Sequence, residues 1–298
     1  MNTNEKHDLG AYIIAPGVED VKRHKLQSQD ICNILAEQAR EQEKQQKALN
    51  IENCGTWLNF RQYFDENSTK VLHSANFCKS PLCPMCAWRK ALKLTHQVGK
   101  AIEESKSKYI YHVVMATENT KTLTKEQIKK FKGYASRFIK KYISNEYAIA
   151  LEITYSSKKG YHPHIHAIVG TDTFIKVSAE YIKHMAVMWA SFVGSTKPQN
   201  TFYVTGITDR EKASRELTKY ILKYEGIDIN KDKKALKDIA VATASMKKIQ
   251  ASGELKKNIA NAGREYAQKR EETTSQLEKA GYDLEIYHWI NGDYIKTN

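Results

Sequence analysis

The sequence has no long apolar run. No stretch approaches the roughly 18 uncharged apolar residues that a membrane-spanning helix needs, and the first ten residues, MNTNEKHDLG, contain no apolar signal core. We therefore expect neither membrane insertion nor secretion, and we expect the protein to act in the cytoplasm. Hydrophobic residues still make up 41% of the 298 residues, which is enough for one substantial core or two small ones.

Acidic residues are in short supply relative to basic ones. The 34 aspartates and glutamates compare with 47 lysines and arginines, so the formal net charge is +13. A positive surplus of this size favours a polyanionic partner, and nucleic acid is the first candidate. Net charge alone does not identify that partner, because a solvated helix face is also rich in lysine.

Cysteine is scarce too, but it is unevenly distributed. Three of the five cysteines fall in the segment CKSPLCPMC, at positions 78, 83 and 86. In a reducing compartment such a cluster indicates a metal site rather than a disulfide framework. Zinc takes four ligands in a tetrahedron, and Cys54 is the natural fourth ligand, with His73 as a substitute.

A closed set of four ligands leaves no open position on the metal, so a structural zinc is expected rather than a catalytic one. The expected ligands are Cys54, Cys78, Cys83 and Cys86. The alternative is that these are ordinary buried thiols. Cys32 lies outside the pattern, and we predict no role for it.

By composition the chain divides into three parts. Residues 1–52 are polar and include a run rich in Gln, Glu and Lys, so we expect an N-terminal appendage with little to bury. Every motif lies in residues 53–226, the expected working domain, which includes a zinc knuckle at 54–86. Residues 227–298 are expected to form a mainly helical C-terminal segment.

The working domain alternates strand-like and helix-like segments. The expected strands are 109–116, 148–155, 165–169 and 201–206. The expected helices are 87–106, 124–143, 178–192 and 212–224, with Ser178 and Asp209 as caps of the last two. This order predicts an α+β fold with a central antiparallel sheet and flanking helices.

The segment GYHPHIHAIV places two histidines on one face of a strand. His164 and His166 are two residues apart, so their side chains point to the same side. If the hairpin is centred near Lys159, Glu152 of LEITY lies opposite His166, and Thr154 opposite His164. Two imidazoles and a carboxylate with an open side suit Mg²⁺ or Mn²⁺.

His162 is a further candidate for the third ligand of this histidine site, or it simply ends the loop before Pro163. A slip of one residue in the hairpin register would turn Glu152 away from the site.

The segment RELTKYILKYEG predicts an amphipathic helix. At about 100° per residue, Tyr220 shares the polar face with Glu216 and Lys223, whereas Tyr224 lies closer to the apolar stripe. A tyrosine oxygen can attack a phosphodiester and hold the product as a phosphotyrosine. Nearby lysines would favour the phenolate or stabilise charge in the transition state.

Taken in order, these segments resemble the replication initiator proteins of bacterial rolling-circle plasmids, which belong to the HUH endonuclease superfamily. The segments that carry the resemblance are CG at 54–55, FCKSPLCPMCAWRK from Phe77, HVVMATEN from His112, LEITY, HPHIH, and ELTKYILK from Glu216.

The resemblance implies a role for each matching residue. His164, His166 and the acidic Glu152 would hold the divalent cation. Tyr220 would be the nucleophile that nicks the plasmid origin, and Glu216 would activate water for the terminating hydrolysis.

The resemblance also implies the partners: origin DNA in single- and double-stranded form, with a host helicase and polymerase. The basic segments 88–108 and 125–141 are expected to supply salt-sensitive DNA affinity.

The sequence departs from the family pattern at two places. Ser80 and Pro81 replace an arginine common in the family, and Tyr224 is similar to the second tyrosine of some phage initiators.

Two other functions fit part of the pattern. HPHIHAIV also matches a histidine-triad nucleotide hydrolase with His164 as nucleophile. That hypothesis gives no role to the clustered cysteines or to the tyrosine helix. A zinc-containing DNA-binding regulator without catalysis would use the cysteines and the positive charge alone. A conjugative relaxase or a transposase would share the nicking chemistry.

Overall fold

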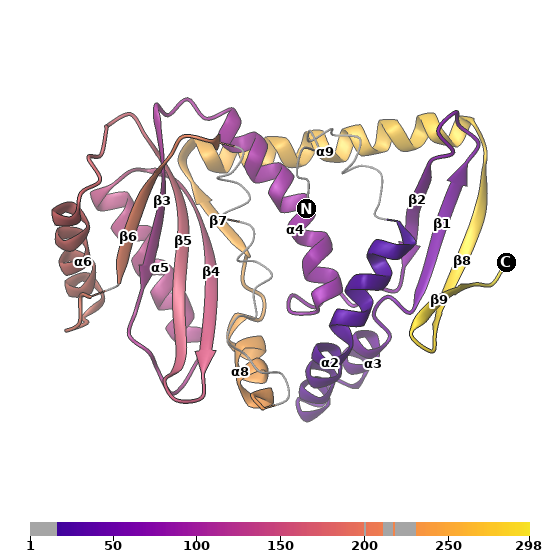
Figure 1. Cartoon of the computed structure of the whole chain (residues 1–298), viewed down its shortest axis with the longest axis horizontal. Coiled ribbons are helices and arrows are strands. Elements are labelled where there is room, and N and C mark those ends of the chain that lie inside the picture. Colours follow the sequence, from indigo (N-terminus) through magenta and orange to yellow (C-terminus); the bar gives the residue numbers. More distant parts are fainter. Residues whose placement is uncertain (1–16, 200, 211–216, 218–230) are drawn as a thin grey trace. The chain divides into compact units, whose positions relative to one another are not determined.

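A computed structural model describes residues 17–199, 201–210, 217 and 231–298 (Figure 1). The described helices are α2 (Val18–Glu41), α3 (Gln45–Glu52), α4 (Pro84–Glu103), α5 (Lys125–Tyr142), α6 (Ala179–Val193), α8 (Lys233–Thr243) and α9 (Gly253–Lys279). The strands are β1 (Trp57–Tyr63), β2 (Lys70–Ala75), β3 (Tyr109–Ala116), β4 (Glu146–Ser156), β5 (Gly160–Thr171), β6 (Phe202–Ile207), β7 (Ile249–Ser252), β8 (Tyr282–Ile290) and β9 (Asp293–Lys296).

These elements form an α+β fold with two antiparallel sheets. The chain divides into two compact units: a first unit from residues 1–93 and 263–298, and a second unit from residues 94–262. The α+β class is as predicted, but the sequence pattern predicted one sheet only. None of the helices in the described part of the chain has both the length and the apolar character to cross a membrane.

The second unit contains the predicted central sheet, with strand order β6-β3-β5-β4-β7 (Figure 1). All four of its neighbouring pairs are antiparallel. The four predicted strands are present as β3, β4, β5 and β6, and β7 was not predicted. Alternation of side chains along each strand gives this sheet two faces of different character.

One face carries the main hydrophobic core of the second unit. Val113, Ile149 and Ile165 point to this side and are fully buried against α5 and α6. Phe138 of α5 packs edge-on against Trp189 of α6, with ring centroids 5.2 Å apart. Burial of such aromatic side chains is among the largest stabilising contributions in a core.

Local sequence sets the start of both core helices. Thr124 and Gln127 form a capping box at α5, in which each side chain bonds the backbone N–H of the other residue. Ser178 caps α6 by accepting from the N–H of Tyr181 at 3.2 Å. The predicted helices 124–143 and 178–192, and the predicted cap at Ser178, are confirmed. The helix predicted at 212–224 lies outside the described residues, apart from Leu217.

The opposite face of the same sheet packs against α4 and α9. Ile110, Ala148 and Ile168 lie on this side and are buried against Val98 and Ile102 of α4 and against Leu255 of α9. The same alternation places the histidines of β5 on this face. The histidines of β5 are therefore separated by the sheet from the core helices α5 and α6.

The β4–β5 hairpin closes one residue earlier than predicted. Gly160 adopts a φ of +89° and pairs with Ser156, so the loop is centred on Lys158 rather than Lys159. A Cβ at Gly160 would lie 2.3 Å from the Thr120 carbonyl oxygen, so only glycine fits. Every cross-strand pair is shifted by two residues from the predicted register.

The first unit is built on a four-stranded antiparallel sheet of order β2-β1-β8-β9. The sequence predicted a mainly helical segment after residue 226. That is right for α8 and α9 but wrong for 282–296, which form β8 and β9. Trp57–Tyr63 pairs with Tyr282–His288 across more than two hundred residues of sequence, and local pattern contains no signal for such a pairing.

Helix α2 is not the exposed appendage that its polar composition suggested. Ten of its 24 residues are buried, among them Val21, Ile31 and Leu35. The buried positions recur three or four residues apart and so form one face of the helix. The expectation that residues 1–52 have little to bury is wrong for the described part of that segment.

Candidate functional site

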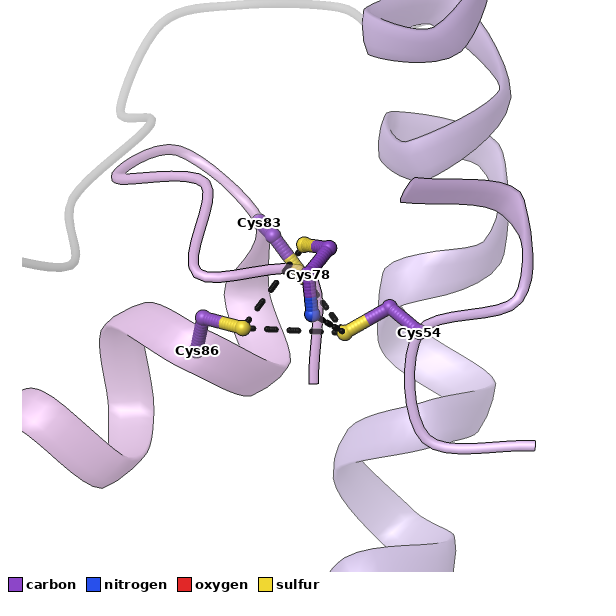
Figure 2. Close-up of side chains that lie close together, drawn as sticks. All are labelled: Cys54, Cys78, Cys83 and Cys86. Carbon is purple, nitrogen blue, oxygen red and sulfur yellow. Dashed lines mark hydrogen bonds between the residues drawn. The ribbon is translucent and has the colours of Figure 1, made fainter. Parts of the chain in front are cut away.

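Four cysteine sulfurs meet at one point in the first unit. Cys54 follows α3, Cys78 and Cys83 lie between β2 and α4, and Cys86 is in the first turn of α4. All four Sγ atoms lie within 4.8 Å of one another, and Figure 2 shows them directed toward a common centre. The predicted set of ligands is therefore assembled, and His73, the predicted substitute, instead contacts Arg61.

The spacing of the sulfurs fits a tetrahedral metal. Zinc bonded to four thiolates at about 2.3 Å separates neighbouring sulfurs by about 3.8 Å. The observed Sγ–Sγ distances are 3.5 Å for Cys83 to Cys54, 3.6 Å for Cys54 to Cys86 and 3.7 Å for Cys78 to Cys86. The cluster can therefore hold a metal such as zinc, and four protein ligands leave no position for a substrate.

Helix α2 supplies two contacts to this cluster that sequence reasoning missed. The Lys25 ammonium is buried and donates to the Cys54 carbonyl oxygen at 2.7 Å. The Cys32 Sγ lies 3.6 Å from the Cys83 Sγ. The two residues are seven apart and so share a helix face, but nothing local in the sequence places that face against the cysteines.

A second basic side chain lies beside the thiols. The Arg89 guanidinium stacks over the Phe77 ring at 3.9 Å. Burial lowers the pKa of Arg89, and the nearby Cys86 sulfur opposes that shift. Lys25 and Arg89 together offset the negative charge that a metal with four thiolates would carry.

In the second unit, the predicted histidine and glutamate side chains also meet. The Glu152 Oε2 lies 2.9 Å from the His166 Nε2 and 3.5 Å from the His164 Nδ1. Glu152 and His166 are buried, whereas His164 is partly exposed. The carboxylate is thus shared by two imidazoles whose ring centroids are 6.3 Å apart.

Strand register explains this contact and corrects the prediction. Glu152 pairs with His164 rather than His166, and Thr154 pairs with His162. Because the error is two residues, an even number, Glu152 stays on the histidine face, and its carboxylate reaches His166 diagonally. The predicted grouping therefore survives a wrong pairing.

The donor atoms can be compared with what a cation requires. Neighbouring ligands of an octahedral ion with bonds of about 2.1 Å are about 3.0 Å apart, close to the contacts at Glu152. The His164 Nδ1 is buried without a hydrogen-bond partner in the described part of the chain. A cation held by all three groups would replace the direct contact between Glu152 and His166.

The histidines control the charge on Glu152. Burial alone would raise the pKa of this carboxyl group, but the adjacent His164 and His166 side chains outweigh it and lower the pKa to about 2. Glu152 is therefore ionised at neutral pH. An ionised carboxylate is a stronger ligand for a divalent cation than a neutral one.

Two more histidines adjoin the site. The His112 Nε2 of β3 lies 3.3 Å from the His166 Nδ1, and the two rings are nearly parallel. His162 packs edge-on against His164 with centroids 4.2 Å apart, and burial lowers the pKa of His162. Sequence reasoning missed His112, although alternation along β3 places it on this face.

The predicted catalytic residues Tyr220, Glu216 and Lys223 lie outside the described residues, as does Tyr224. Leu217 is described. It is fully buried in the cluster that includes Ile168 and Ala150, on the same sheet face as the histidines.

Comparison with known proteins gives a consistent result. A family model, Rep_1, described as "Replication protein", matches residues 69–295. The matched range includes both histidines, Glu152 and three of the four clustered cysteines, while Cys54 precedes it. No solved structure matches the chain.

Several individual proteins, each named "Protein rep", are similar to this chain. One from a Bacillus species is 30% identical over 132 residues, which is 41% of this chain and 43% of that protein. One from Bacillus amyloliquefaciens is 30% identical over 154 residues, 46% of this chain and 45% of that protein. One from Staphylococcus aureus is 26% identical over 196 residues, 61% of this chain and 85% of that protein. The chain thus spans less than half the length of the two Bacillus relatives.

Proposed function

Because this chain belongs to the Rep_1 family of replication proteins, we propose that it initiates rolling-circle replication of a plasmid by nicking one strand of the origin DNA. The family membership agrees with the resemblance drawn from the sequence motifs. The proposed activity is that of a single-strand endonuclease and strand transferase, acting in the cytoplasm where the plasmid lies.

In the proposed reaction, the Tyr220 hydroxyl oxygen attacks the scissile phosphorus. A bond forms between the tyrosine oxygen and the 5′-phosphate, the bond from phosphorus to the 3′-oxygen breaks, and the 3′-oxygen takes up a proton. The free 3′-hydroxyl then serves a polymerase, with a helicase opening the duplex. Lys223 stabilises charge in the transition state, and Glu216 activates water for the final hydrolysis.

Glu152, His164 and His166 would hold a divalent cation, Mg²⁺ or Mn²⁺, that supplies Lewis-acid polarisation of the scissile phosphate. Glu152 contributes a charged oxygen because its pKa is about 2. Cys54, Cys78, Cys83 and Cys86 would hold a structural zinc, since four protein ligands leave it no open position.

The observation that carries this proposal is the contact of one carboxylate with two histidines on a single sheet face, at 2.9 and 3.5 Å. Supporting it, Leu217 is buried against that same face and precedes Tyr220 by three residues. Attack on a cation-bound phosphate requires the nucleophile to lie close to the cation, and the burial of Leu217 on this face is in keeping with that requirement.

The test is covalent capture of DNA. Full-length protein is mixed with Mn²⁺ and a labelled single strand carrying the plasmid origin, and the adduct is resolved on a denaturing gel. We expect an adduct with wild-type protein, none with Tyr220→Phe, and a normal yield with the matched control Tyr109→Phe, at the partly exposed start of β3. Tyr224→Phe tests whether a second tyrosine transfers the strand.

The competing functions give different results. A phosphohistidine formed without metal would overturn the proposal in favour of a nucleotide hydrolase of the histidine-triad type. DNA binding with neither adduct nor cleavage would leave a non-catalytic regulator. Loss of the adduct in His164→Ala and His166→Ala, with recovery at high Mn²⁺ concentration, would support the cation site.

A further inference from the structure

Helix α5 carries an unusual concentration of positive charge. Its 18 residues include seven lysines and arginines and one acidic residue, Glu126. By comparison, α9 has six basic and five acidic residues, and α2 has four and five. A helix face that is merely solvated is typically balanced in the way that α2 and α9 are.

The charge lies on one side of α5. Counting about 100° per residue from Lys125, the outward-facing cations fall between about 0° and 160°, and the buried residues between about 220° and 340°. The outward-facing set, here called the α5 stripe, is the half-buried Lys125 and the exposed Lys129, Lys130, Arg137, Lys140 and Lys141. The remaining lysine, Lys132, is buried and donates to the Lys247 carbonyl oxygen. The stripe thus faces away from the sheet.

The described residues leave the charge of the stripe unneutralised. Within the described residues, no carboxylate oxygen lies within 4.0 Å of its nitrogens. The contacts that the cations do make are with aromatic rings: Lys130 and Arg137 flank Tyr134 at 5.6 and 5.0 Å from its centroid, and Lys141 lies 5.1 Å from that of Tyr142. Like charges three or four residues apart weaken a helix rather than stabilise it.

Glycine interrupts the middle of the stripe. Gly133 lies at about 80° on the same helical count, and a Cβ there would meet nothing within 4 Å. Glycine in a helix interior costs stability, and packing does not require it here. The absence of a long side chain at Gly133 leaves the space between the neighbouring cations open.

We propose that the α5 stripe binds the phosphate backbone of duplex DNA without reading its sequence. The charges are complementary, and the 18-residue helix is about 27 Å long, which matches the axial length of about eight base pairs of duplex DNA. This inference rests on the proposed function for the presence of DNA. It adds a surface on the sheet face opposite Glu152, His164 and His166, away from the nicking chemistry.

The first experiment measures the salt dependence of binding. Full-length protein is titrated onto a fluorescent 30-base-pair duplex of arbitrary sequence, by anisotropy, from 50 to 300 mM NaCl. In the variant Lys130→Gln/Arg137→Gln/Lys141→Gln we expect the slope of log K against log salt to fall by about 2 to 3 and affinity to fall roughly 10- to 100-fold at 100 mM, because each phosphate contact contributes about 0.9 to the slope.

The matched control removes the same charge elsewhere in the second unit. Lys176, Lys183 and Lys257 are exposed and lie off α5 and outside the basic segment 88–108, so their joint change to Gln should alter the slope by less than one. Equal slopes and affinities for the two triple variants would overturn the proposal and leave the net charge as the cause. Unchanged affinity in the stripe variant would overturn it too, and would favour an acidic protein as the partner of α5.

A second pair of variants separates binding from folding. Gly133→Ala should raise the melting temperature and leave duplex affinity unchanged, while Gly133→Glu should also raise it yet weaken the affinity several-fold. Equal affinities in this pair would contradict the proposal. These assays measure binding and not cleavage, so a negative result would overturn the duplex-binding proposal and leave the nicking proposal intact. Duplex binding without any covalent adduct would overturn the nicking proposal and leave the duplex-binding proposal intact.

Discussion

The two ring nitrogens of His166 have different partners. The Nε2 faces the Glu152 carboxylate at 2.9 Å, and the Nδ1 faces the His112 Nε2 at 3.3 Å. If the His166 Nδ1 carries the proton and donates it to His112, the Nε2 keeps a lone pair for a cation. His112 would then act as a positioning residue that fixes the tautomer and the ring orientation of a metal ligand.

This role predicts a selective defect. In His112→Ala we expect the Mn²⁺ concentration needed for half-maximal nicking to rise by about 10- to 100-fold, while the rate at saturating Mn²⁺ stays near that of the wild type. The cause is loss of orientation of His166 rather than loss of a ligand. The measurement is a Mn²⁺ titration of nicking, with calorimetric Mn²⁺ binding as an activity-independent readout.

The control for His112 is His184→Ala, which removes an exposed histidine from α6 in the same unit. His112→Gln can still accept a hydrogen bond from His166 and should recover part of the Mn²⁺ affinity. Superimposable Mn²⁺ titrations for His112→Ala and the wild type would rule out the positioning role.

The sheet of the second unit was predictable because its strands obey a local rule. In β3, β4 and β5, apolar side chains alternate with smaller or polar ones, and that period of two reveals both the strand and its faces. The same rule grouped Glu152 with His164 and His166. It did not determine the register, because the loop length depends on the left-handed conformation of Gly160 and its contact with Thr120.

The first unit was mostly missed because its contacts are not local. β1 pairs with β8 from the far end of the chain, and the buried face of α2 meets cysteines encoded far downstream. Polar residues such as Lys25 look exposed in the sequence and are buried only by this docking. The cysteines were the exception, since close spacing of three thiols is itself a local signal.

The sheet of the first unit is joined across its strands by one acidic residue. Glu285 of β8 contacts Lys70 of β2 at 2.5 Å and Lys296 of β9 at 2.7 Å, and it accepts a hydrogen bond from Tyr287. Burial would raise the pKa of Glu285, but these partners outweigh burial and lower the pKa to about 2. Glu285 therefore links both edge strands to the interior of the sheet.

Glu285→Gln should reduce the free energy of unfolding of the first unit by about 1 to 2 kcal/mol at pH 7, a figure that allows for solvent screening at the partly exposed lysines. The folded pKa lies below the unfolded value near 4.5. The stabilisation is thus complete above about pH 4.5 and is lost as the pH falls toward 2. Urea unfolding of both proteins at pH 3, 5 and 7 measures the difference.

The control is Glu66→Gln, in the exposed turn between β1 and β2, which should change stability by less than about 0.5 kcal/mol at any of these pH values. A difference between Glu285→Gln and the wild type that is as large at pH 3 as at pH 7 would show that the charge of Glu285 is not the cause.

The two compact units of the chain are stabilised by different means. The second unit has a continuous core of 17 buried residues between its sheet, α5 and α6, and no cysteine of the chain lies in it. The first unit is instead organised around four thiols. Three parts of the chain meet there: α2, the segment between β2 and α4, and the residues after α3. A metal bound there would be part of the folding energy of that unit alone.

Removal of the metal should therefore destabilise one unit and spare the other. After treatment with a strong chelator, we expect amide protection in α2, β1 and β2 to fall at least tenfold, while β3, β4 and β5 keep theirs. Hydrogen exchange with mass spectrometry on the full chain resolves the two. Cys54→Ser should reproduce the chelated state because it removes a ligand. The control Cys32→Ser changes a contact to Cys83 but removes no ligand, so it should keep its zinc and most of the amide protection in α2, β1 and β2. Loss of protection in β3 to β5 together with α2 would mean that the units do not unfold separately, and unchanged protection everywhere would mean that the thiols hold no structural metal.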